Sequence, residues 1–509
     1  MRRSVLAAVV IASVFAPAVA FAPSLVPTVA RGHGATVAGA RWCAAGICVR
    51  EAALGRIHAA EGALGWDGVL RLRDVVVRTD EGAAAVVERA APTSDASWAE
   101  LPRVPYVRRV EVTDLVIEGT PLPPLSGEVA PERHLVGEGA RIDGDEAELT
   151  LDTEWGPVEV RVRPAAWPGR REVEARGRLS LSHPSLGGVL ADRDVRVVGE
   201  LDGRDFTGDL RVEGVTAHVS ARVGGAAKAT GTFVLADTPI AAVFDVFAPI
   251  VPEAARADIG GTVAARGRFA LEPLAITVEP VVAGFTVDGL VSDAYKYGQF
   301  SWMGRDETGA HRPVSGGDDT PGWLPLAAVG ELLPMAVIAA EDARFLEHDG
   351  YDLDGMLDAA RDNAEAGEVR RGGSTLTQQL AKNLFLTGDR TYARKLRELL
   401  YAVEMERELG KRRILELYLN VVEWGPRVVG CKAATEAYFL KSPSGLLPEE
   451  AAFLASILRN PRGGWAKQYV GGRLDARRLS WILDNMVALP EVVRRDALTR
   501  EVRFVPPEG

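Results

Sequence analysis

The densest run of potential ligand-binding side chains lies at residues 371–383, in the sequence R-G-G-S-T-L-T-Q-Q-L-A-K-N. Paired glycines let a ligand approach the backbone, and hydroxyls, amides and lysine supply donors to a phosphate-like or sugar-like anion. A helix cap with glutamines on a solvated face would explain Ser374 but not the whole run. The run therefore predicts a binding site. Its candidate residues are Arg371, Ser374, Thr375, Gln378, Gln379, Lys382 and Asn383.

Two carboxylates precede this run. Glu341 and Asp342 stand at the expected end of an apolar helix, in the sequence E-D-A-R-F-L-E-H-D-G, which continues through Phe345 to His348. On its own, an acid-rich helix end is typical of a solvated surface. Next to a site that binds an anion, the same carboxylates could supply a general base. We therefore include these four residues among the candidates.

A third group, Arg394, Lys395 and Glu398, lies on an expected amphipathic helix. Arg394 and Glu398 are four residues apart, which alone favours a surface ion pair worth about 0.2–0.5 kcal/mol. The charge distribution changes this interpretation, because residues 341–368 hold ten acidic side chains whereas residues 370–413 are rich in Arg and Lys. Such segregation suits a site that deprotonates one reactant and holds an anion on another.

Helical periodicity after Trp323 is expected to position all three groups. Helices are expected over residues 335–345, 394–408, 411–420 and 448–459. Before this region, apolar and charged residues alternate with a period of two, as at Val158, Val160 and Val162, which is typical of half-buried antiparallel strands. The β-rich part shows no catalytic constellation, since His183 and His218 are isolated among strands.

The composition restricts the class of protein. A chain of 509 residues should hold two or three domains, and a net charge of -11 argues against general nucleic-acid binding. Cys43 and Cys48 are close enough in sequence to bridge in an oxidising compartment, whereas Cys431 is expected to be a small buried apolar residue. Two N-terminal arginines precede an apolar stretch, residues 4–22. We expect a retained membrane anchor with the bulk of the chain outside the cytoplasm; a cleaved secretory signal stays the alternative.

The helical region resembles the glycosyltransferase family 51 domain, the peptidoglycan polymerase module of class A penicillin-binding proteins and monofunctional biosynthetic transglycosylases. Five blocks in order carry the resemblance, and N-V-V-E-W-G at residues 420–425 favours the monofunctional kind. The blocks are Glu341–Gly350, Gly372–Asn383, Arg394–Glu398, Lys411–Asn420 and Ala434–Ala455. The β-rich part loosely resembles the β-sheet modules of AsmA-like envelope proteins.

The resemblance implies a multidomain chain: an N-terminal membrane segment, an antiparallel β-rich domain and a mostly α, lysozyme-like glycosyltransferase domain. The expected organisation is a signal or anchor at 1–30, a β-rich domain at 31–303, a linker at 304–322, the glycosyltransferase domain at 323–470 and a helical extension at 471–509. Too few residues follow the domain for a penicillin-binding transpeptidase, and we see no serine-lysine and K-T-G pattern. The expected location is the bacterial inner membrane, single-pass, with the bulk in the periplasm.

The resemblance also implies lipid II and the nascent glycan strand as partners, with Glu341 as the catalytic base and Glu398 as the second essential carboxylate. Lys382, Arg394 and Lys395 match cations that receive the departing pyrophosphate. The other candidate residues are implied to bind substrate. No residue is assigned as a metal ligand, and a divalent cation, Mg or Mn, is left open as a cofactor.

Two positions depart from the family pattern, because Leu440 and Arg427 stand where glycine is common. Two rival functions stay open beside the polymerase. A lytic hydrolase of lysozyme-like fold would have no use for a pyrophosphate clamp, and a non-catalytic envelope scaffold would not need to keep Glu341, Lys382 and Glu398. Other cell-wall synthesis proteins could bind through the β-rich domain.

Overall fold

The computed structural model describes residues 35–505 with gaps at 44–45, 55–56, 66–68, 79–108, 121–132, 144–145, 154, 168, 224–228, 272–273, 306–310, 367–371, 388–390, 462–468, 471–472 and 475. The anchor or signal expected over 1–30 lies outside the described residues. No helix within the described ranges is long and apolar enough to cross a membrane.

Contacts divide the chain into two units. The first holds most of the chain up to Gly284; the second holds Phe285–Gly509 together with Pro184–Gly187 and Ile250–Gly260. Residues 285–303, expected to belong to the β-rich domain, thus group with the helical part. A β-rich N-terminal region followed by a helical region is the architecture that the sequence predicts, and the structure confirms it.

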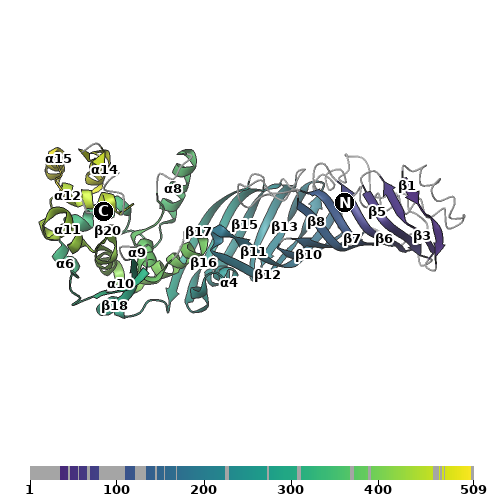
Figure 1. The fold of residues 1–509 in the computed structure, drawn as a ribbon, viewed down its shortest axis with the longest axis horizontal. Helices are drawn as coiled ribbons and strands as arrows, with labels where there is room; N and C mark the ends of the chain where they lie inside the picture. Colours follow the sequence, from purple (N-terminus) through teal and green to yellow (C-terminus); the bar gives the residue numbers. More distant parts are fainter. Residues whose placement is uncertain are drawn as a thin grey trace. The chain divides into compact units, whose positions relative to one another are not determined.

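A 17-stranded sheet dominates the first unit, and Figure 1 shows its strands following one another along the chain. The strands that begin the sheet are β1 (Ala35–Ala38), β2 (Arg41–Cys43), β3 (Gly46–Val49), β4 (Glu51–Leu54), β5 (Ile57–Gly65), β6 (Val69–Arg78), β7 (Arg109–Thr120), β8 (Arg133–Asp143) and β9 (Glu146–Thr153). They continue as β10 (Gly156–Pro164), β11 (Arg170–His183), β12 (Gly188–Asp202), β13 (Asp205–Val212), β14 (Val215–Val223), β15 (Ala229–Pro239), β16 (Asp258–Leu271) and β17 (Leu274–Asp288). The short helices among them are η4 (Pro184–Leu186), α4 (Ile240–Phe247) and η5 (Pro252–Ala255).

Antiparallel pairing, which the alternating pattern predicts, holds for most of this sheet. Among the strand pairs whose register the structure describes, the exception is β6 with β7, which run parallel with Val69 opposite Arg109. A parallel pair needs a crossover of a dozen or more residues, and the connection 79–108 is long enough to provide one. The expected tight turn at Asp202-Gly203 is present, since Asp202 pairs with Asp205 across it and Gly203 has a φ of 61°.

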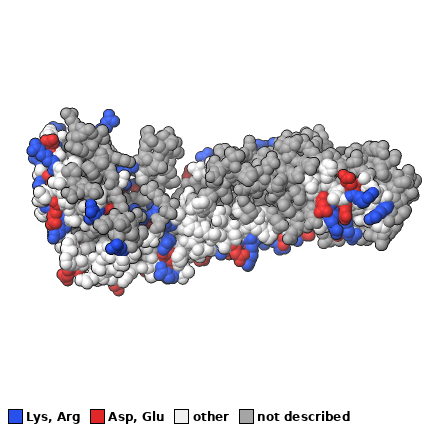
Figure 2. Space-filling view, viewed as in Figure 1, with Lys and Arg blue, Asp and Glu red and all other residues white. Residues whose placement is uncertain are grey.

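Charged side chains on one face of the strands form cross-strand ion pairs. Arg161 contacts Glu148 at 2.8 Å, and Arg196 contacts Glu174 at 2.8 Å. Figure 2 shows Lys and Arg side chains next to Asp and Glu along this part of the molecule. Each exposed pair contributes little by itself, about 0–1 kcal/mol, but opposite charges across neighbouring strands favour this register.

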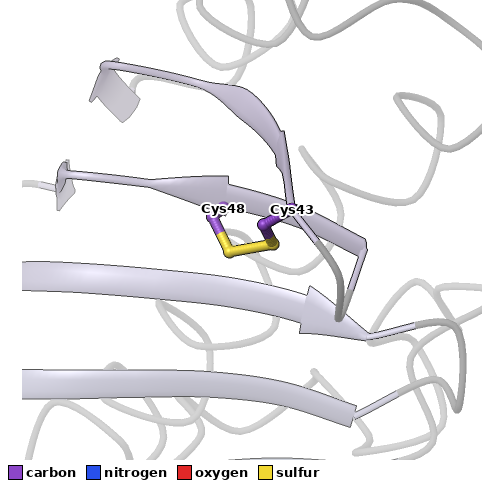
Figure 3. Close-up of a disulfide and its surroundings, with 2 residues drawn as sticks. All are labelled: Cys43 and Cys48. Atoms are coloured by element: carbon purple, nitrogen blue, oxygen red, sulfur yellow. A yellow bond between two sulfur atoms is a disulfide. The ribbon is translucent and has the colours of Figure 1, made fainter.

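The cysteines behave as their spacing suggests. Cys43 and Cys48 form a disulfide that joins β2 to β3 (Figure 3). Cys431 is free and fully buried, as expected for a small apolar residue, and burial raises the pKa of its thiol to about 12.

The second unit is mostly helical. Its helices are α5 (Ala294–Tyr297), α6 (Leu326–Val329), α7 (Leu332–Glu341), α8 (Leu353–Ala366), α9 (Leu376–Phe385), α10 (Tyr392–Val421), α11 (Cys431–Phe439), η6 (Pro443–Gly445), α12 (Pro448–Ile457), α14 (Ala476–Asn485) and α15 (Glu491–Thr499). Its strands are β18 (Gln299–Arg305), β19 (His311–Gly317), β20 (Glu423–Gly425), β21 (Val428–Val429), β22 (Tyr469–Val470) and β23 (Arg473–Leu474). Residues 304–322, expected to be a linker, include β19, which pairs with β18.

The apolar core of this unit explains why the helices hold their places. Leu333, Leu380, Trp424 and Phe453 are all fully buried in one cluster. Burying each such side chain stabilises the fold by about 1.5–3 kcal/mol. The two helices expected over 394–408 and 411–420 both form. They lie end to end within α10 and are separated at Gly410, whose φ of 69° and ψ of 162° are not helical.

The outer side of α10 is held by residues that precede the helical region. Glu253 of η5 is 2% exposed and accepts two hydrogen bonds from Arg397, at 2.8 and 2.7 Å. Glu404 is also 2% exposed and accepts from three backbone N–H groups at 289–291. Pairing of this kind offsets the cost of burying a carboxylate. These contacts fix the helix that carries Arg394, Lys395 and Glu398.

The two departures from glycine both occur in left-handed backbone. Leu440 has φ 55° and ψ 36°, and Arg427 has φ 65°. Leu440 ends α11 in a left-handed C-cap, in which its own N–H donates to the carbonyl of Glu436 at 3.1 Å. The Lys441 N–H donates to the carbonyl of Thr435. A side chain in this conformation costs roughly 1–2 kcal/mol, which explains why glycine is common there.

We expect Leu440→Gly to stabilise the protein by about 0.5–1 kcal/mol, because it relieves this strain while adding some disorder to the unfolded chain. Little packing is lost, since Leu440 is 82% exposed. Thermal unfolding should show a higher Tm. The control is Val487→Gly, at a side chain that is 90% exposed and lacks a positive φ; an equal gain there would contradict the explanation.

Candidate active site

Glu341 is the last residue of α7, and its carboxylate is held at one oxygen only. Gln379 of α9 donates from Nε2 to Glu341 Oε2 at 3.2 Å. Glu341 Oε1 is buried and has no hydrogen-bond partner among the residues that the structure describes. A buried carboxylate oxygen without a donor is costly, so it marks a position where a substrate hydroxyl could bind.

The surroundings of Glu341 shift the pKa of its carboxyl in opposite directions. Burial raises the pKa of this carboxyl, which favours its protonated form. The hydrogen bond from Gln379 partly opposes this shift. Three cations also lower the pKa, namely Arg478, Arg459 and Lys382. The result is a carboxyl whose pKa lies above the usual range, as suits a general base that must take up a proton.

Because folding disfavours the ionised form of Glu341, this residue should destabilise the protein at neutral pH. The destabilisation begins as the pH rises through the unfolded pKa of about 4.3 and is complete above the folded pKa. We expect Glu341→Gln to raise the Tm at neutral pH by roughly 2–4 °C, the response of a unit of this size to about 1 kcal/mol. Thermal unfolding across pH should show this gain vanish below about pH 4; a gain independent of pH would contradict the explanation.

Asp342 fixes the loop that follows Glu341. Its Oδ2 accepts from the backbone N–H of Leu376, the first residue of α9, at 2.8 Å. The same oxygen lies 3.0 Å from His348 Nε2. Since Gly350 N–H donates to His348 Nδ1 at 3.2 Å, the ring hydrogen sits on Nε2 and points to Asp342. Asp342 and His348 thereby tie the end of α7 to the start of α9.

Phe345 lies behind this loop and is fully buried. Lys411 Nζ lies 4.6 Å from the centre of its ring and also donates to the carbonyl oxygen of His348. Glu406 accepts from Lys411 at 2.9 Å and from the hydroxyl of Thr377. A ring enclosed in this way supports the loop and is not placed to contact a substrate, which differs from the binding role expected for Phe345.

Glu398 pairs with two neighbouring cations of α10. Arg394 donates to its Oε1 at 2.7 Å and Lys395 to its Oε2 at 3.1 Å. Lys395 also donates to Ser374 Oγ at 2.6 Å and to Gln378 Oε1 at 3.0 Å. Glu398 is only 4% exposed, so the pairing is more than a surface contact. The surface ion-pair alternative for Arg394 and Glu398 is therefore wrong.

Helix α9 connects these two groups of side chains. Ser374, just before its N-cap, and Gln378, in its first turn, contact Lys395. The next residue, Gln379, contacts Glu341. Thr375 is the N-cap in a reciprocal capping box with Gln378, so these two have structural roles as well. Lys382 and Asn383 lie one turn further along, both partly exposed. Arg371 lies outside the described residues.

No group of three or more His, Cys, Asp or Glu side chains within the described ranges is arranged to hold a metal ion. Several residues that support this site are not among the candidates that the sequence predicts: Tyr418, Glu406, Lys411 and Arg478. Of these, Lys411 and Tyr418 fall within the fourth family block, but only their distances reveal what they contact.

Comparisons with known proteins identify the family of the helical unit. A family model described as Transglycosylase matches residues 312–487. A biosynthetic peptidoglycan transglycosylase of Thiobacillus denitrificans is 45% identical over 170 residues, which are 33% of this chain and 72% of the relative. One from a Janthinobacterium strain is 45% identical, over 33% of this chain and 73% of the relative.

A third relative of the same name, from Aromatoleum aromaticum, is 50% identical over 154 residues, or 30% of this chain and 66% of the relative. The matches thus cover about a third of the chain, and the family model falls within the second unit. The chain belongs to the family of biosynthetic peptidoglycan transglycosylases, and its helical unit carries the peptidoglycan glycosyltransferase domain.

Proposed function

We propose that the protein polymerises lipid II into glycan strands. The 4-hydroxyl of the incoming sugar attacks the anomeric carbon of the growing chain with inversion. The new glycosidic bond forms as the bond to the pyrophosphate breaks, so undecaprenyl pyrophosphate leaves with the electron pair. We further propose that the protein has no transpeptidase activity, because its sequence lacks the serine-lysine and K-T-G pattern.

Glu341 is the proposed base. An unactivated sugar hydroxyl is a poor nucleophile at neutral pH, and a positioned base contributes about 10²–10⁴ in rate. The observation that carries the proposal is that Glu341 Oε1 is buried and has no hydrogen-bond partner among the residues that the structure describes. Its second oxygen is already occupied by Gln379, so the incoming hydroxyl has one oxygen available for its proton.

The cation cluster is the proposed site of the leaving group. Negative charge grows on the pyrophosphate as the bond breaks, so fixed cations stabilise the transition state more than the ground state. Lys395 and Arg394 are preorganised by their ion pairs with Glu398. Lys382 is close enough to Glu341 for its charge to lower the pKa of that carboxyl. Ser374 and the remaining polar residues of the 371–383 run would provide neutral donors. A divalent cation, Mg or Mn, stays a proposal only.

The proposed location is the bacterial inner membrane, with residues 1–30 as the anchor and the bulk of the chain in the periplasm. The substrate's lipid stays in the bilayer, so an anchor would confine enzyme and substrate to one surface and raise their effective concentration. The Cys43–Cys48 disulfide supports an oxidising compartment. The β-rich region is a proposed interaction module for other cell-wall synthesis proteins.

Incubating the purified full chain with labelled lipid II, and separating the products on a gel, tests the polymerase proposal. A ladder of glycan strands is the expected result. Offering finished glycan strands then distinguishes the two alternatives, because a hydrolase would shorten them whereas a non-catalytic scaffold would leave both substrates unchanged. Either of those outcomes would overturn the proposal.

A further inference from the structure

A buried hydroxyl with no role in the reaction scheme lies behind the proposed base. Tyr418 of α10 is 1% exposed, and its O–H donates to Gln379 Oε1 at 3.0 Å. The Nε2 of the same amide donates to Glu341 Oε2 at 3.2 Å. Three residues, from α10, α9 and α7, therefore form one chain of hydrogen bonds that ends at the carboxylate.

The chemistry of the three groups gives this chain a direction. An ionised carboxylate only accepts hydrogen bonds, whereas an amide has a donor on one side and an acceptor on the other. When Gln379 turns Nε2 toward Glu341, its Oε1 faces the interior and needs a donor, which Tyr418 supplies. Tyr418 remains protonated, because burial and the charges of Glu341 and Asp342 raise its pKa well above the usual range.

If the amide turned over, its oxygen would face the carboxylate oxygen instead. Two acceptors would then oppose each other unless Glu341 held a proton. The orientation of Gln379 thus decides whether the carboxylate is stabilised in its ionised form, the form that can accept a proton from a sugar hydroxyl.

We propose that Tyr418 is a positioning residue for the base, whose hydroxyl holds the Gln379 amide with its N–H toward Glu341. The inference rests on the proposed function of Glu341. Tyr418 does not touch substrate in this arrangement, because the amide of Gln379 lies between it and the carboxylate.

Other charged groups also face Glu341, and the test must leave them unchanged. Arg478 of α14, Arg459 after α12 and Lys382 of α9 each act on its charge. Asp342, its neighbour, is engaged by the Leu376 N–H and by His348. Tyr418→Phe removes one oxygen atom and alters none of these groups, so it isolates the effect of the amide orientation.

The experiment is the rate of lipid II polymerisation by the full chain as a function of pH, for wild type and Tyr418→Phe. The wild-type rate should fall at acid pH as Glu341 takes up a proton. In Tyr418→Phe the midpoint of this fall should move upward by about one pH unit, the effect of losing one buried hydrogen bond. Well above the midpoint the two rates should approach each other.

Tyr438→Phe is the matched control. Tyr438 is also fully buried, and its hydroxyl donates to the carbonyl oxygen of Trp424 at 2.9 Å, away from Glu341. Both variants should lower the Tm, but only Tyr418→Phe should move the midpoint. In a Gln379→Met background, Tyr418→Phe should cause no further movement, because the amide that transmits the effect is absent.

Equal midpoints in wild type and Tyr418→Phe, with both tyrosine variants merely less stable, would overturn the positioning role. That outcome is distinct from failure of the proposed function. If the wild-type protein polymerised no lipid II at any pH, the assignment of the reaction would fail first.

Discussion

Glu341→Gln should abolish chain growth while leaving the protein folded. The amide cannot accept the proton of the attacking hydroxyl, and the loss of a positioned base lowers the rate by at least about 10²–10⁴. The variant should be folded because an uncharged group replaces a buried carboxylate whose Oε1 has no partner among the described residues. The measurement is polymerisation of labelled lipid II, with circular dichroism of the same preparation.

The second unit offers a closely matched control for this variant. Glu449 of α12 is 2% exposed and also has a buried oxygen, Oε2, without a hydrogen-bond partner within the described ranges. Glu449→Gln should retain wild-type chain growth. Ordinary activity in Glu341→Gln, or equal losses in the two variants, would refute the assignment of Glu341 as base.

Lys395→Met should have the next largest effect, a loss of about 10²–10³ in turnover. This magnitude follows from the removal of one preorganised group that stabilises charge in a transition state. Lys395 Nζ contacts Ser374, Gln378 and Glu398, so its position is fixed before substrate binds. The measurement is the initial rate of lipid II consumption at saturating substrate.

Lys441→Met controls for the loss of a lysine ion pair. The Lys441 side chain is 37% exposed and contacts Glu450 at 2.8 Å, whereas that of Lys395 is 34% exposed. We expect Lys441→Met to affect stability alone. If Lys395→Met kept a rate within about threefold of wild type, the cation cluster would not be the site that stabilises the leaving group.

The sequence is sufficient to predict the parts of the site that depend on local pattern. Glu341 at the end of an apolar helix and Arg394 one turn before Glu398 are placed by helical periodicity alone. Both helices form, although α7 covers Leu332–Glu341 and not the expected 335–345. The hydroxyl and amide run also holds polar contacts, although Thr375 and not Ser374 is the helix cap.

Contacts between distant residues could not be predicted in this way. In the sequence, Tyr418 occupies a position that fits the apolar pattern of a buried helix. Only the fold brings its hydroxyl to Gln379. Glu253 and Arg397 are 144 residues apart in a chain without repeats that would align them. The parallel pair β6–β7 was missed for a related reason, because alternation reports a half-buried strand but not the direction of its neighbour.

The most direct test of the account counts two products in one reaction. Lipid II would be labelled in both the sugar and the lipid, and disaccharide units added and undecaprenyl pyrophosphate released would be measured over time. The account predicts one pyrophosphate released for each disaccharide added by the wild type, and neither product with Glu341→Gln. Chain growth by the Gln variant at the wild-type rate, or release of pyrophosphate without chain growth, would contradict it.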